Sequence, residues 1–386
     1  MAAPAEEGCF REMKTVQLLL AAVLLGLLAA FVFRVSEKMA DFEVYWRGAS
    51  RAAAAEPLYR ADDEHYRFKY LPAFAVLTIP LSFVPLPTAK VAWFAGSASL
   101  LVLFIGISLR LLPERKRPTA LLAMAAVVVL GKFFGHELIL GQVNILFGVL
   151  AASAFLSMRA GREPLAGALL ALTIAIKPYG VLFLPWLVAR RNRSSVAAAI
   201  VTAFVIALLP VAVYGFGETV ALHRAWLDTV TGTTPSNLLN LDNVSFASMW
   251  VKWLGAGTLA NMLAIATAVA AIGAVAIVFL RRGGMTFPEA LEGSLLLMIV
   301  PLLSPQGWDY VLLLTAPAIV LLANYGDRLA TGMRVAAMVA ALTMGLSLFD
   351  AVGRDAYAAF MKTAAISVCA CVLIAAVCSL RLRKVA

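Results

Sequence analysis

The stretch MADFEVYWRGAS, residues 39–50, places Asp41 shortly after the first apolar run of the chain. On a helix that begins at Asp41, the charged residues Glu43 and Arg47 share one face, and an apolar face lies opposite. Such a helix suits a bilayer surface, where a carboxylate is well placed to act as a general base toward an acceptor hydroxyl. The alternative is that Asp41 only caps the helix, as aspartate does well. Glu43 has Arg47 as its i+4 partner and is expected to be a structural acid.

Lys177 is a second residue whose position suggests chemistry. It precedes Pro178 inside an apolar run at residues 164–190. Proline breaks a helix, and a lysine at the middle of a bilayer costs roughly 2.5–3.5 kcal/mol. A cation at this depth suits a phosphate group, whereas a structural lysine would snorkel to the surface or pair with an acid.

Further candidate binding residues lie near the ends of apolar runs. Arg67 and Lys69 precede a proline-rich apolar stretch and would contact either a phosphate or anionic lipid headgroups. Gln142 and Asn144 begin an apolar run. Their side chains would bond either sugar hydroxyls or neighbouring helices.

Several other chemistries lack the residues that they need. The stretch HELIL at 136–140 has no second histidine, so a zinc protease is not indicated. The three histidines are scattered, and the acidic stretch 62–64 is typical of a solvated loop rather than a metal site. No glycine-rich phosphate loop and no dinucleotide-binding pattern occurs. We therefore expect no metal, no cofactor and no nucleotide-sugar donor. The four cysteines suggest no disulfide framework.

The elements that position these residues are membrane helices. Hydrophobic residues make up 62% of the 386 residues and charged residues only 14%, which is incompatible with an ordinary water-soluble domain. The chain is predicted to be an all-α, polytopic integral membrane protein. Its net charge of +10 is explained by basic cytoplasmic loops rather than by nucleic acid. The polar residues after the first apolar run and the many later runs argue against a cleaved signal peptide.

Apolar runs predict about ten full spans. They lie near residues 15–33, 89–111, 118–134, 142–158, 195–214, 258–280, 288–304, 309–325, 334–350 and 358–380. Residues 71–84 are too short and too rich in proline to cross, and are predicted to be a re-entrant or interfacial half-helix. Residues 164–190 are predicted to form a broken hairpin that turns at Lys177-Pro178 and returns to its starting side.

The basic clusters fix the orientation of these spans. With the two exceptions above, all seven clusters fall on one face, which the positive-inside rule assigns to the cytoplasm. They are Lys14, 115–117, 159/162, 190–193, 281/282, 328/334 and 381–384. The opposite face receives an outer loop at 34–88 with surface helices, residues 135–141, an outer loop at 215–257, and residues 305–308 and 351–357. Both termini are expected in the cytoplasm, and residues 1–386 form one integral domain.

Several motifs together resemble glycosyltransferase family 87. They are Asp41-x-x-Val44-Tyr45-Trp46 with Gly48, Leu58-Tyr59, KYLPAFAVLTIPL at 69–81, GQVNILFGVL at 141–150, GALLALTIAIKPYGVLFLPWLVARR at 167–191 and LLSPQGWDYVLLL at 302–314. Each motif is weak alone, but their order and spacing are fairly specific, and they cover most of the chain. The family includes bacterial mannosyltransferases that use polyprenyl-phosphate sugars.

This resemblance implies a type C glycosyltransferase fold with its active site on the outer, periplasmic or extracellular face of the cytoplasmic membrane. It implies transfer of a hexose such as mannose from a polyprenyl-phosphate donor to a lipid or glycan acceptor, with inversion and with Asp41 as the base. Tyr45, Trp308 and Asp309 stand in the matching motifs, and Asn243 stands where relatives carry Asn-Gln-Ser; all four are candidate substrate-binding residues. The chain departs from the family where relatives carry histidines after Trp308 and Asn-Gln-Ser near residues 240–250.

Two readings from other classes compete with a transferase. A transporter or flippase of a lipid-linked sugar would also use a broken helix with a buried charge. However, the two halves of the chain contain no corresponding pair of broken helices, and the polar residues gather on one face. A structural subunit of an envelope complex would need Asp41 only for assembly.

Overall fold

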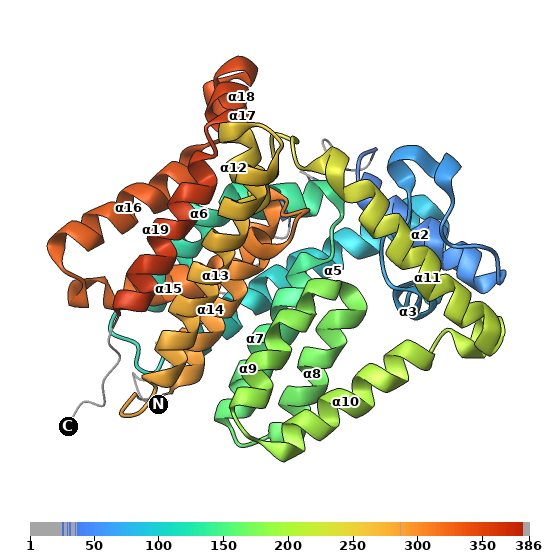
Figure 1. The fold of residues 1–386 in the computed structure, drawn as a ribbon, viewed down its shortest axis with the longest axis horizontal. Coiled ribbons are helices and arrows are strands. Elements are labelled where there is room, and N and C mark those ends of the chain that lie inside the picture. Colours follow the sequence, from blue (N-terminus) through green and yellow to red (C-terminus); the bar gives the residue numbers. More distant parts are fainter. Residues whose placement is uncertain are drawn as a thin grey trace, which may run out of the picture.

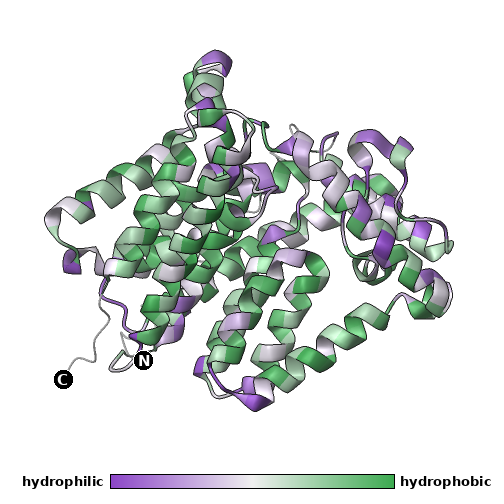
Figure 2. Cartoon of the chain, viewed as in Figure 1, coloured by the Kyte–Doolittle hydropathy of each residue, from purple (hydrophilic) through white to green (hydrophobic). Residues whose placement is uncertain are grey.

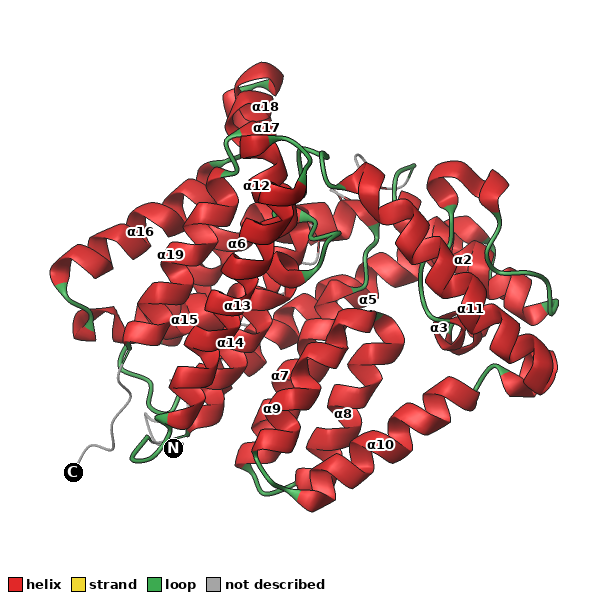
Figure 3. Cartoon of the chain, in the orientation of Figure 1, coloured by secondary structure: helices red, strands yellow, loops and turns green. Residues whose placement is uncertain are grey.

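The computed structural model describes residues 37–285 and 287–380, together with Leu25, Gly26, Ala29, Phe31 and Val35. Within this part of the chain every named element is a helix, which confirms the predicted all-α class (Figure 3). The predicted first span, 15–33, lies mostly outside the described residues, and so do the basic residues Lys14 and 381–384.

The helices form three neighbouring groups (Figure 1). The first contains α6 (Thr119–Leu140), α12 (Phe246–Leu254), α13 (Thr258–Leu280), α14 (Pro288–Leu303), α15 (Ala316–Tyr325), α16 (Thr331–Leu346) and α19 (Ala365–Ser379). The second contains α7 (Asn144–Arg159), α8 (Glu163–Ile176), α9 (Leu184–Ala189) and α10 (Arg193–Leu208). The third contains α2 (Ala40–Ala53), α3 (Pro72–Leu77), α4 (Ile79–Ser82) and α11 (Val211–Asn237). Helix α5 (Leu86–Leu111) contacts all three groups through α6, α7 and α2.

Shorter elements connect these groups. They are the 3-10 helices η2 (Ala61–Tyr66), η3 (Pro178–Phe183), η4 (Asp309–Thr315) and η5 (Gly326–Arg328), and the helices α17 (Phe349–Val352) and α18 (Arg354–Lys362).

Four helical stretches among the described residues are long and apolar enough to cross a membrane: Leu86–Arg110, Thr119–Leu140, Thr258–Leu280 and Asp309–Arg328. The number rises to six if two bent pairs each count as one span. Apolar side chains dominate the long helices, and polar residues gather in the connections at their ends (Figure 2). The chain is therefore a multi-pass, all-helical membrane protein by length and composition. The predicted count of about ten is not confirmed, because α7, α14 and α16 have only 16 residues each.

Both predicted exceptions appear as broken segments. Residues 71–84 form α3 and α4, of six and four residues, which are too short to cross. Residues 164–190 break at Lys177, whose extended backbone (φ −145°, ψ 133°) is the conformation favoured before proline. The following helix η3 then packs back on α8, since a Cβ on Gly180 would lie 2.4 Å from Thr173 Oγ1.

Two other predicted segments differ from the structure. The predicted span 195–214 bends by 89° between α10 and α11, because Pro210 follows the end of α10. Residues 215–257 are mainly helical rather than a loop, since α11 and α12 occupy most of them. The predicted span 358–380 is also divided, into α18 and α19, which meet at 56°.

Basic segments from distant parts of the sequence meet at one end of the molecule. The Arg159 guanidinium bonds the carbonyl of Arg110 and lies over the ring of Phe287. Arg190 and Arg282 both pair with Glu289. Helices α7 and α8 lie side by side (Figure 1), and Arg159 and Arg162 lie at the C-terminus of α7 and just before α8, so this basic cluster is one helix length away from the N-terminus of α7.

Helix α2 does not present its apolar face to a bilayer, contrary to the expectation from its sequence. Phe42, Tyr45 and Ala49 are fully buried. The helix packs against α3, α4, α5 and α6, and a Cβ on Gly48 would collide with the ring of Phe68 at 2.7 Å. Protein therefore covers the face that was predicted to contact lipid.

Candidate active site

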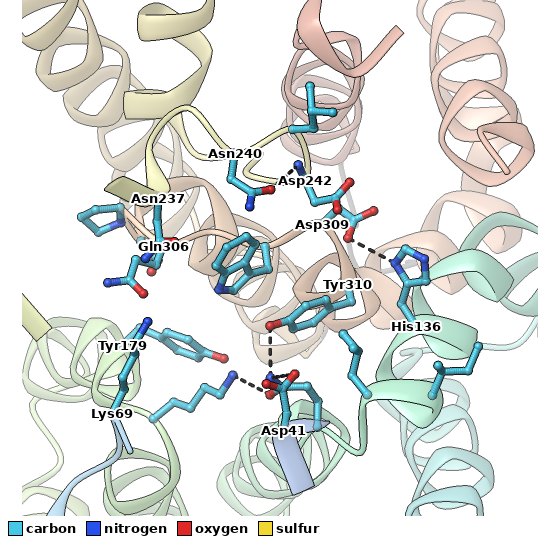
Figure 4. A pocket seen from close by; sticks show the side chains of 18 of the residues that line it. Asp41, Lys69, His136, Tyr179, Asn237, Asn240, Asp242, Gln306, Asp309 and Tyr310 are labelled. Carbon is cyan, nitrogen blue, oxygen red and sulfur yellow. Dashed lines mark hydrogen bonds and ion pairs between the residues drawn. The ribbon is translucent and has the colours of Figure 1, made fainter. Parts of the chain in front are cut away.

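A cavity of about 1790 Å³ lies beside the N-terminus of α7 and the C-terminus of α8, where Gln142 and Lys177 line it. Its lining comes from all five segments that were predicted to share the outer face, and from the break at Lys177. Figure 4 shows how Asp41, Lys69, His136, Asp242, Asp309 and Tyr310 converge on this space from different helices.

Gln142 joins the polar side chains on the floor of this cavity. Its Nε2 donates to Asp41 Oδ2 at 2.8 Å and to the Tyr310 hydroxyl at 3.1 Å. Its Oε1 accepts from Lys177 Nζ at 3.0 Å and from the Tyr45 hydroxyl at 3.1 Å. The Tyr45 hydroxyl also lies 2.7 Å from that of Tyr70. One amide therefore holds the carboxylate and the lysine in fixed positions.

The backbone at Gly141 explains why Asp41 and Gln142 meet. Helix α6 ends at Leu140, and Gly141 has the left-handed conformation (φ 70°) that glycine adopts after a helix. The start of α2 packs directly on this turn, because the Met39 N–H bonds the Ile139 carbonyl at 3.0 Å. A Cβ on Gly141 would lie 2.6 Å from Phe42 Cβ. Glycine is therefore needed for the approach that brings Asp41 to Gln142.

Asp41 is not a helix cap. The N-cap position belongs to Met39, and no side chain caps this end of α2. The carboxylate turns instead into the cavity, where burial raises the pKa of Asp41 above its usual range. The hydrogen bond from Gln142 and the charges of Lys177 and Lys69 oppose this shift. Glu43 pairs with Arg47 at 2.7 Å, as its spacing predicted, and does not line the cavity.

Three candidate cations line the cavity with Asp41. Lys177 is buried and has no carboxylate within ion-pair distance among the described residues. Lys69 is half-buried, and burial lowers its pKa, as does the charge of Arg67. The backbone of Lys69 is held by Trp226, whose Nε1 donates to its carbonyl at 3.2 Å. This arrangement leaves cationic groups facing open space, which suits an anionic ligand.

Asn144 lies behind the cavity wall rather than in it. Its Nδ2 donates to Glu137 Oε2 at 2.8 Å, and its Oδ1 accepts from the Tyr179 hydroxyl at 2.5 Å. Glu137 is fully buried and also accepts from the N–H of Ile145 at 3.0 Å. The sequence reasoning missed Glu137 as a site residue, although an acid within an apolar run is itself a signal of function or of a specific partner.

Asn243 also lies outside the cavity lining. Its side chain donates to the carbonyls of Asn237 and Pro305, at 3.0 and 2.8 Å, and so joins the loop after α11 to the Ser-Pro-Gln-Gly turn. That turn requires Gly307, because a Cβ there would lie 1.8 Å from the Pro301 carbonyl oxygen. The adjacent Trp308 does line the cavity.

Asp309 lines the cavity within a buried ion-pair cluster. Its carboxylate lies 3.0 Å from Lys132 Nζ, and the two side chains are only 1% and 2% exposed. His136 Nδ1 lies 3.5 Å from the other carboxylate oxygen (Figure 4). The sequence analysis identified Asp309 but neither of these partners on α6. Their spacing, i and i+4 on one helix face, was a detectable signal.

The family model of glycosyltransferase family 87 matches residues 68–305, more than half of the chain. The chain belongs to glycosyltransferase family 87. This confirms the resemblance inferred from the motifs and identifies the protein as a membrane glycosyltransferase. The matched region includes Lys69, Gln142 and Lys177, whereas Asp41 precedes it and Asp309 follows it. No curated protein and no solved structure matches the chain.

Proposed function

We propose that this family 87 enzyme transfers a hexose such as mannose from a polyprenyl-phosphate donor to a lipid or glycan acceptor. The observation that carries the proposal is the position of Asp41, whose carboxylate is held by Gln142 in a large cavity with Lys177, Lys69 and Arg67. A base and several cations in one cavity are what transfer from a sugar phosphodiester needs.

The proposed reaction is a single displacement. The acceptor hydroxyl oxygen attacks the anomeric carbon while Asp41 takes its proton. The bond from the anomeric carbon to the phosphate oxygen breaks, and the polyprenyl phosphate leaves with the electron pair. Lys177 stabilises the charge on that phosphate, with Lys69 and Arg67 nearer the solvent. Attack opposite the phosphate inverts the configuration, so a β-linked donor gives an α-linked product.

The decisive test is the release of free polyprenyl phosphate. We expect purified protein in detergent to release it from a mannosyl polyprenyl phosphate, measured by mass spectrometry, when an acceptor lipid extract is added. A flippase moves this lipid without cleaving it. A folded protein that releases no polyprenyl phosphate from any tested sugar donor would favour the flippase.

We further propose the type C fold, with the cavity on the outer face of the cytoplasmic membrane and about ten crossings. The basic clusters at the opposite end of the molecule support this orientation, because positive loops stay in the cytoplasm.

This orientation predicts a labelling pattern in intact cells. We expect Arg115→Cys, in a background with the four native cysteines replaced by serine, to resist a membrane-impermeant maleimide. Asp62→Cys, in the exposed η2 segment near the cavity end, is the matched control and should react rapidly. Ready labelling at position 115 and protection at position 62 would reverse the orientation.

A further inference from the structure

The cavity has a second end whose charges differ from those near Asp41. At the Asp41 end, the carboxylate is accompanied by Lys38, Arg67, Lys69 and Lys177. The other end, which we call the far end, is lined by Lys132, His136, Asp242, Trp308, Asp309, Asp350, Arg354, Asp355 and Tyr357. It holds four acids against two permanent cations and one histidine. A phosphate is therefore attracted to the Asp41 end and disfavoured at the far end.

Side chains at the far end are held by one another. Lys132 Nζ contacts Asp309 at 3.0 Å and the Tyr357 hydroxyl at 3.1 Å. That hydroxyl donates to Asp242 Oδ1 at 2.8 Å, and the Asp309 N–H donates to the Asp242 carbonyl at 2.8 Å. Lys132 therefore offsets the charge of Asp309, the cluster keeps an excess of acids, and its side chains are fixed before any ligand binds.

His136 is the accessible member of this cluster. Its side chain is 36% exposed, and its Nδ1 faces Asp309. Among the described residues, no side chain or backbone group bonds its Nε2. The ring edge that carries Nε2 is therefore available to a ligand in the cavity, while Asp309 fixes the orientation of the ring.

We propose that the far end is the acceptor subsite and binds a hydroxyl-rich group, a glycan or a polyol headgroup. His136 and Asp242 bond the hydroxyls of this group, and Trp308 supplies an aromatic face for the ring. Asp309 is a positioning residue that acts through His136. The proposal rests on the proposed transferase function, because it assigns the second of the two substrates that a transferase must hold.

The connection between the two ends supports this assignment. Tyr310 follows Asp309 in η4, and its hydroxyl bonds Gln142, which holds Asp41. Asp309 of the far end is therefore connected to the base Asp41 through its sequence neighbour Tyr310 and the amide of Gln142. An acceptor bound there approaches Asp41 from the side that does not hold Arg67 and Lys69, so both substrates fit in one cavity without competing for the same cations.

The first test uses the wild-type protein and needs no turnover. Diethyl pyrocarbonate modification of each histidine is followed by mass spectrometry, with methyl α-mannoside or with a polyprenyl phosphate as the probe. We expect methyl α-mannoside to slow the modification of His136 several-fold, with no effect on His223 of α11. Protection by polyprenyl phosphate instead, or by neither probe, would overturn the proposal.

The second test separates the two substrates kinetically. In His136→Gln we expect the KM for methyl α-mannoside as acceptor to rise about tenfold, because one hydrogen bond to a sugar hydroxyl is lost. The KM for the donor should change less than twofold. His223→Gln is the matched control and should change neither. A larger rise in the donor KM would contradict the assignment.

These experiments keep the two proposals distinguishable. If no polyprenyl phosphate is released from any donor, the transferase proposal fails, while the protection of His136 still reports what the far end binds. If release occurs and His136 shows neither protection nor the shift in KM, only the acceptor subsite is refuted.

Discussion

An Asp41→Asn variant should turn over about 10²–10⁴ times more slowly than the wild-type protein, because this is the usual contribution of a general base. Asparagine has nearly the same shape as aspartate, and its side-chain oxygen still accepts the N–H of Gln142. The Gln142 network therefore survives, and donor binding should remain nearly intact. The measurement is release of polyprenyl phosphate at saturating donor, with donor affinity determined separately by titration.

Glu43→Gln is the matched control for this variant. Glu43 lies two residues further along the same turn of α2, but it pairs with Arg47 outside the cavity lining. Its substitution should change turnover by less than about threefold, since Glu43 does not line the cavity and its partner Arg47 is partly solvent-exposed. Near wild-type transfer by a folded Asp41→Asn variant would remove Asp41 from the mechanism and make Asp309 the next acid to test.

The pH profile gives a second check on Asp41. Burial raises the pKa of Asp41, and only the ionised carboxylate accepts a proton, so turnover should fall as the pH decreases through this raised pKa. The midpoint should lie above the value of about 3.9 that is normal for aspartate. Asp41→Asn should abolish this acidic limb, whereas Glu43→Gln should retain it.

Much of the site was predictable because membrane chemistry makes a few residue types informative. A lysine before a proline inside an apolar run is costly, so Lys177 marked the break of the helix and was a candidate for function; the structure confirms the break and places Lys177 in the cavity lining. The positive-inside rule also predicted which five segments would share one face, and all five contribute to the lining of one cavity. Both inferences rest on the cost of placing a charged side chain in the bilayer, and that cost can be judged from the neighbouring residues in the sequence.

The remainder depended on contacts between distant residues. Gln142 was identified as a candidate, but its role as the shared partner of Asp41, Lys177 and Tyr310 requires the turn at Gly141 and the docking of α2 on it. Asn243 is a residue type that often binds sugar hydroxyls, yet its side-chain amide already donates to two backbone carbonyls. The apolar face of α2 has the periodicity of a surface helix, and periodicity does not distinguish lipid from protein as the covering material.

Lys177→Met should raise the KM for the donor about 10- to 100-fold, because a charge-assisted hydrogen bond to phosphate is worth about 1.5–3 kcal/mol. The protein should remain folded, since the substitution removes a buried cation that has no ion-pair partner among the described residues. Gln142 Oε1 also keeps the Tyr45 hydroxyl at 3.1 Å and the Tyr70 hydroxyl at 3.4 Å. Donor titration and thermal unfolding in detergent would measure the two effects separately.

The same variant tests whether Lys177 acts on the donor or only on Asp41. The charge of Lys177 lowers the pKa of Asp41, so its removal should move the acidic limb of the pH profile to higher pH. Lys90→Met is the matched control, because Lys90 is also buried but does not line the cavity; its Nζ bonds the Lys38 carbonyl and lies 3.8 Å from Glu43. Lys90→Met should change neither the acidic limb of the pH profile nor the KM for the donor. A shifted limb with an unchanged donor KM would make Lys177 a partner of the base alone, and the phosphate would then be assigned to Lys69, the next cation along the cavity wall.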